Sequence, residues 1–95
     1  MLYKLYDIIK DRQSNPRSGS YTNQLLEQGQ DRILQKIGEE AVELIVAAGS
    51  QGDQRLIEET ADLFYHLYVL LAMRHITLDD IESELEHRHA PENNS

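Results

Sequence analysis

Apolar positions recur at helical spacing along most of this chain. Leucines and isoleucines between residues 2 and 9 predict a first short amphipathic helix, which ends before Asn15-Pro16. Residues 15–20 contain a proline and a glycine, and this composition predicts a loop. A brief helix is expected from about Tyr21 to Gln28, and Gly29 ends it.

Two long apolar-periodic segments follow and predict a helical hairpin. The first helix is expected over about 31–48, and Gly49-Ser50-Gln51-Gly52 forms a tight connector. The second helix is expected to start with Asp53 as its N-cap and to run to about Arg74. Because the connector is short, the two helices should be antiparallel neighbours.

The end of the chain carries signals for one more helix. Thr77-Leu78-Asp79-Asp80 resembles a capping box, with aspartate in place of the usual glutamate. His75 stands where glycine is expected, in the left-handed conformation that closes a helix. Residues 91–95 are interpreted as a disordered tail after a single domain over 1–90. The fold class is all-α, since no strand alternation or internal repeat occurs in the sequence.

Both long helices carry a narrow polar stripe on an otherwise apolar circumference, and helices of this kind are normally buried on more than one side. At about 100° per residue, one polar sector of the first helix holds Lys36, Glu39, Glu40 and Glu43. The stripe on the second helix holds Glu59, Asp62 and His66. A single histidine among leucines and tyrosines is more often a hydrogen-bonded core residue than a ligand, so His66 is expected in the core.

The hairpin brings these two stripes together. Glu43 and Glu59 are equidistant from Gln51, and so are Glu40 and Asp62. Residues equidistant from the turn lie at the same height in an antiparallel pair, and i,i+3 spacing puts each acidic pair on one face. The sequence therefore predicts that four carboxylates converge within a few ångströms.

Four carboxylates in a cleft with little water need either raised pKa values or a cation. A set of oxygen ligands alone favours Mg²⁺, or Mn²⁺, over zinc and copper. Magnesium binds phosphate oxygens readily, so the expected chemistry is phosphoryl transfer to water. The alternative interpretation is an ordinary solvated acidic face, which is the commoner case for any one of these residues.

Length, charge and composition narrow the classes of function. Ninety-five residues allow one domain with a marginal core, so oligomerisation is expected. The net charge of −8 argues against binding to nucleic acid, whose phosphates attract lysine and arginine. The absence of cysteine excludes disulfides and thiolate sites. No apolar run reaches the roughly 20 residues that span a membrane, and a cytoplasmic protein is expected.

The acidic residues also carry a resemblance. The segments Glu39-Glu40-Ala41-Val42-Glu43 and Glu59-Thr60-Ala61-Asp62 resemble the EExxE…ExxD signature of the MazG-like all-α nucleotide pyrophosphohydrolases. With Ser20-Tyr21-Thr22, Ala61–Leu67 and Ile76–Ile81, the chain is similar to the phosphoribosyl-ATP pyrophosphohydrolase family over roughly residues 2 to 90. The resemblance implies a helical bundle of four to five helices, completed by homodimerisation or a higher even oligomer.

The resemblance further implies Mg²⁺-dependent hydrolysis of phosphoribosyl-ATP to phosphoribosyl-AMP and pyrophosphate, the second step of histidine biosynthesis. It assigns metal ligation to Glu40, Glu43, Glu59 and Asp62. Glu39 is expected to orient or deprotonate water, and Lys36 to steady a phosphate. Substrate binding is expected from Arg12, Arg17, Ser20, Tyr21 and Thr22, because backbone N–H groups near a helix start favour anions.

Two other functions remain open at this point. The first is a house-cleaning pyrophosphohydrolase for dUTP, dCTP or aberrant nucleotides, which would use the same metal site. The second is a non-enzymatic helical interaction module with an acidic surface, which would bind no metal specifically. A ferritin-like di-metal bundle is discounted because it needs Glu-x-x-His on two separate helices.

Overall fold

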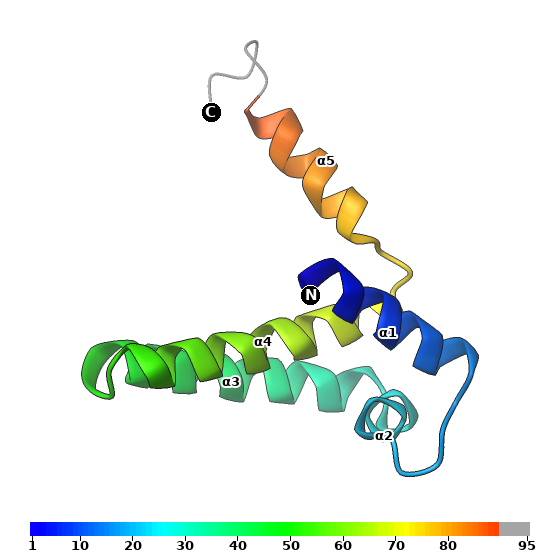
Figure 1. The fold of residues 1–95 in the computed structure, drawn as a ribbon, viewed down its shortest axis with the longest axis horizontal. Helices are drawn as coiled ribbons and strands as arrows, with labels where there is room; N and C mark the ends of the chain where they lie inside the picture. The colour runs from blue at the N-terminus through cyan, green and yellow to red at the C-terminus, as the bar shows by residue number, and fades with distance from the viewer. Residues whose placement is uncertain (90–95) are drawn as a thin grey trace.

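The computed structural model describes residues 1–89, and the tail expected at 91–95 lies outside this range. Five helices follow one another, and no strand occurs within residues 1–89, so the all-α prediction is confirmed. They are α1 (Leu2–Ser14), α2 (Tyr21–Gln28), α3 (Gln30–Ser50), α4 (Asp53–Met73) and α5 (Leu78–Arg88) (Figure 1). The first four match the expected order and lie within two or three residues of the expected bounds.

Helices α3 and α4 form the expected antiparallel hairpin, which is the longest feature in Figure 1. The connector is shorter than predicted, because α3 continues through Ser50 and only Gln51 and Gly52 link the two helices. Gly52 has a φ of 88°, a left-handed conformation that favours glycine. The N-cap of α4 is therefore Gly52, and the prediction that Asp53 caps it is wrong. Asp53 is instead in the first turn of α4, where its charge complements the helix dipole.

The core lies at the end of the hairpin away from Gly52. There α1 crosses α4 and α2 covers the start of α3 (Figure 1). The buried cluster consists of Tyr6, Ile9, Leu25, Ile33, Val69 and Ala72. This packing fixes the relative position of α2 and α4, and so determines which side chains meet beside the acidic stripes.

Short-range hydrogen bonds hold the helix ends as the sequence indicates. The hydroxyl of Ser20 accepts from the backbone N–H of Asn23 and caps α2. Thr77 and Asp80 form the reciprocal capping box at the start of α5, which confirms that prediction. His75 adopts a φ of 57°, the left-handed conformation expected at this turn.

Much apolar surface of α3 and α4 stays exposed, and α5 projects away from the other helices (Figure 1). The radius of gyration is 15.3 Å, against about 12 Å for a compact domain of this length. Exposed apolar side chains on α3 and α4 include Leu34, Val42, Ile45, Val46 and Ile57. A single chain thus leaves uncovered the sides of α3 and α4 that their composition predicts to be buried. Within residues 1–89, no helix has both the length and the apolar character needed to cross a membrane.

Candidate metal centre

Three of the four predicted carboxylates meet between α3 and α4. Glu40 and Glu43 lie one turn apart on α3, Glu59 lies opposite them on α4, and each offers an oxygen within 4.8 Å of the others. The i,i+3 spacing and the short connector place them as the sequence predicts. The structure therefore contains a convergent acidic cluster, defined here as Glu40, Glu43 and Glu59.

Two carboxylates of the acidic cluster are buried. Glu40 is 6% exposed and Glu59 is 2% exposed, whereas Glu43 faces solvent. One oxygen of each buried carboxylate, Oε2, finds no hydrogen-bond partner among the described residues. A buried carboxylate oxygen without a partner costs free energy, and a bound cation is one way to satisfy it. The donor set is all oxygen, which fits a hard divalent cation.

The protonation of Glu40 reflects this environment. Burial is the largest cause that raises the pKa of Glu40 to about 7, and the neighbouring charges of Glu43 and Asp62 add to it. The adjacent Glu59 carboxylate also favours the protonated form, while Lys36 acts in the opposite direction. Like charges forced together in a poorly hydrated site produce this upward shift, and a cation among them would reverse it.

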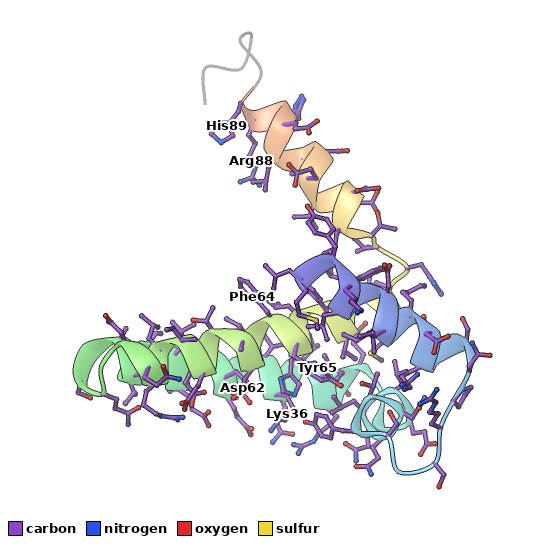
Figure 2. The ribbon with its side chains drawn as sticks, viewed as in Figure 1. Lys36, Asp62, Phe64, Tyr65, Arg88 and His89 are labelled. Atoms are coloured by element: carbon purple, nitrogen blue, oxygen red, sulfur yellow. The ribbon has the colours of Figure 1, made fainter. Side chains whose placement is uncertain are left out.

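Asp62 takes a more peripheral position than predicted. It is exposed and does not belong to the three-carboxylate cluster, although its charge acts on Glu40. Figure 2 shows Asp62 and Lys36 on the same side of the helix pair, with Phe64 on the opposite side. The height of Asp62 on α4 is as expected, but its side chain lies toward solvent at the open edge of the cluster.

Each buried carboxylate has a cation one helical turn before it. The Nζ of Lys36 lies 3.9 Å from Glu40 and 3.9 Å from the exposed Glu39. On α4, the guanidinium of Arg55 pairs with both Glu58 and Glu59. The sequence reasoning missed Arg55, although its i,i+4 spacing to Glu59 is a signal that could have identified it.

Polar contacts tie the start of α2 to α4, about one helical turn beyond Asp62. His66 is buried, and its Nδ1 lies 2.8 Å from the backbone oxygen of Asp62. Since a carbonyl oxygen only accepts, Nδ1 carries the proton and Nε2 accepts from the Tyr21 hydroxyl at 3.0 Å. Thr22 is buried as well, and its hydroxyl contacts that of Tyr65. The prediction that His66 is a hydrogen-bonded core residue is confirmed.

The predicted basic residues lie at the end of α1 and in the loop that follows it. Arg12 pairs with Asp11 at 2.8 Å, and Arg17 lies in the exposed loop before α2. The buried Asn23 holds this loop, since its amide donates to the backbone oxygen of Arg12 and its Oδ1 accepts from the N–H of Arg17. Asn23 was not predicted, and its only sequence signal is its place three residues after the capping Ser20.

Comparison with known proteins identifies the family of the chain. A sequence profile of the family described as phosphoribosyl-ATP pyrophosphohydrolase matches residues 2–89, nearly the whole chain. The chain belongs to this family. Phosphoribosyl-ATP pyrophosphatase from Clostridium acetobutylicum is 50% identical over 93% of this chain and 80% of that protein. The enzyme of the same name from Listeria welshimeri is 50% identical over 93% of this chain and 84% of its own length.

A third relative is larger. The histidine biosynthesis bifunctional protein HisIE from Caldanaerobacter subterraneus subsp. tengcongensis is 51% identical over 94% of this chain. This chain spans 43% of that relative's length, so the match concerns one part of the bifunctional protein. Membership of the phosphoribosyl-ATP pyrophosphohydrolase family confirms the resemblance of the sequence motifs.

Proposed function

We propose that this chain hydrolyses phosphoribosyl-ATP to phosphoribosyl-AMP and pyrophosphate, and that a Mg²⁺ ion held by Glu40, Glu43, Glu59 and Asp62 supports the reaction. Family membership supports this reaction, because the chain is a hydrolase with a nucleotide substrate in the second step of histidine biosynthesis. The acidic cluster supports the metal, because two of its oxygens are buried without a hydrogen-bond partner within residues 1–89.

The residues of the site fit a divalent cation. Glu40 and Glu59 supply buried oxygens, and Glu43 and Asp62 supply oxygens from the solvent side. Mg²⁺ accepts such an arrangement because it keeps several waters and binds phosphate oxygens. When bound, the cation would neutralise phosphate charge and lower the pKa of an attacking water. Mn²⁺ has the same ligand preferences and should substitute for it.

Two side chains at the edge of the cluster are assigned to the substrate. Lys36 is close to Glu40 and can place its ammonium against a phosphate oxygen. Glu39 is exposed on the same face and accepts a hydrogen bond from Gln35 at 3.0 Å, so it can orient or deprotonate a water. The loop before α2 offers Arg12, Arg17 and the helix start at Ser20 for further anionic groups.

A second copy of the chain is proposed to cover the exposed apolar sides of α3 and α4. The open shape and the uncovered residues, such as Val42, Ile45 and Ile57, support an even oligomer, with a dimer as its unit. A hollow of about 340 Å³ between α4 and α5, lined by apolar residues that include Phe64 and Ile81, supports the same proposal. Light scattering of the wild-type chain tests it, and a monomer at micromolar concentration would contradict it.

The activity is tested by pyrophosphate release from phosphoribosyl-ATP beside dUTP, dCTP and ATP, first with Mg²⁺ and then with chelator. Chelator-sensitive turnover of phosphoribosyl-ATP alone is the expected result. Faster turnover of dUTP or dCTP would favour the house-cleaning alternative and keep the metal site. No turnover of any nucleotide by the folded protein would support the interaction module.

A further inference from the structure

An aromatic pair lies where the start of α2 meets α4, about one helical turn beyond Asp62. Tyr21, the first residue of α2, stacks on Tyr65 of α4 with ring centroids 6.0 Å apart and planes inclined by 23°. Tyr21 is 46% exposed, while Tyr65 is partly buried behind it. An aromatic ring that is half exposed and backed by a second ring presents a flat apolar surface to solvent.

This surface is rigid because polar contacts fix both rings. The Tyr21 hydroxyl donates to Nε2 of His66, and the hydroxyls of Tyr65 and Thr22 contact each other. The His66 ring is itself fixed through Nδ1 to the backbone oxygen of Asp62. A ring ordered before binding loses little conformational freedom when a ligand covers it.

The position of the pair suits one end of a nucleotide. His66 follows Asp62 by four residues, so the two share one face of α4 and lie about 6 Å apart along the helix. Lys36 and the acidic cluster handle the phosphates in the proposed reaction. A nucleotide with its phosphates at the cluster must extend its base away from it, and Tyr21 is linked to this face of α4 by its hydrogen bond to His66.

We propose that the adenine ring of the nucleotide stacks on the exposed ring of Tyr21, with Tyr65 as backing. The proposal rests on the proposed function, which supplies the nucleotide. Stacking uses the face of the base and not its edge, so this surface favours the larger purine ring over a pyrimidine without reading purine identity. Tyr21 thereby becomes a specificity-determining residue.

Direct binding by calorimetry tests the proposal apart from turnover. The ligands are AMP, CMP and inorganic triphosphate, and the proteins are wild type, Tyr21→Phe, Tyr21→Trp, Tyr21→Leu and the control Tyr3→Leu. Tyr3 is an exposed tyrosine on α1 that contacts Glu82 of α5. Wild type should bind AMP more tightly than CMP, and Tyr21→Leu should weaken AMP about tenfold or more, while triphosphate binding changes less than about twofold.

The aromatic variants separate the ring from its hydroxyl. Tyr21→Phe and Tyr21→Trp should bind AMP within about threefold of wild type, and Tyr3→Leu should leave all three ligands unchanged. An equal loss of AMP binding in the Phe, Trp and Leu variants would overturn the proposal, since the hydroxyl and not the ring would then matter. Parallel losses of AMP and triphosphate in Tyr21→Leu would also overturn it. Failure of wild type to hydrolyse phosphoribosyl-ATP would overturn the proposed function but leave these binding results interpretable.

Discussion

Glu40 of α3 and Glu59 of α4 face each other across the helical hairpin, and each keeps one buried carboxylate oxygen that no described residue satisfies. Two such groups destabilise a fold that has no cation between them. Their presence in an otherwise apolar helix pair supports the proposed Mg²⁺ site, whose cost in stability can be measured without any substrate.

Replacing Glu40 by glutamine should stabilise the metal-free protein and remove most activity. At pH 8 the Glu40→Gln variant no longer has to ionise a buried carboxyl whose pKa is about 7. The expected gain is about 1–3 kcal/mol in the free energy of unfolding, measured by urea denaturation in chelator. Glu27→Gln, at an exposed position of α2, is the matched control and should change neither quantity. A Glu40→Gln variant that is less stable and still active would contradict the metal site.

The stability of the metal-free protein should depend on pH through Glu40. Burial raises the pKa of Glu40 from 4.5 to about 7, so the folded state binds more protons than the unfolded state between these values. The free energy of unfolding contributed by this group is therefore fully present below about pH 4.5 and is lost as the pH rises through 7. The difference between wild type and Glu40→Gln isolates this term from the other carboxylates. A difference that stays constant between pH 5 and pH 8 would refute it.

Removal of the Arg55 charge should tighten metal binding. The guanidinium of Arg55 pairs with Glu59 and is half exposed, so it acts as a cation in competition with the proposed metal. Arg55→Gln should increase Mn²⁺ affinity by about threefold, a modest factor because solvent screens an exposed pair. Calorimetric titration with Mn²⁺ measures it, and Arg88→Gln, on the distant α5, provides the control. Weaker Mn²⁺ binding in Arg55→Gln would show that Arg55 supports the site instead.

A glycine at position 75 should stabilise the protein and leave its activity unchanged. His75 has a φ of 57°, a conformation that side chains with a Cβ adopt at some cost. His75→Gly should raise the free energy of unfolding by about 0.5–1 kcal/mol, seen as an increase of several degrees in Tm. Arg74→Gly serves as the comparison, because Arg74 has a φ of −95° and gains nothing from glycine. Loss of stability in His75→Gly would mean that the His75 side chain makes a contact worth more than the strain.

The sequence by itself determined the helices and the meeting of the acidic pairs. Helical periodicity, caps and breakers act over a few residues, so the order of helices, the capping box of Thr77 and the left-handed turn at His75 followed from local pattern. The approach of Glu40, Glu43 and Glu59 followed as well, because a short connector permits only an antiparallel neighbour.

Tertiary structure decided what each side chain does once the helices are in place. The exposed position of Asp62, the pairing of Arg55 with Glu59 and the link from Tyr21 to His66 depend on rotamers and on how α2 is seated against α4. These features arise from packing between segments far apart in the sequence, which no local pattern encodes. Burial is likewise a property of the assembled helices. It removes one oxygen each of Glu40 and Glu59 from water with no hydrogen-bond partner in the described part of the chain, and it is the largest cause of the raised pKa of Glu40.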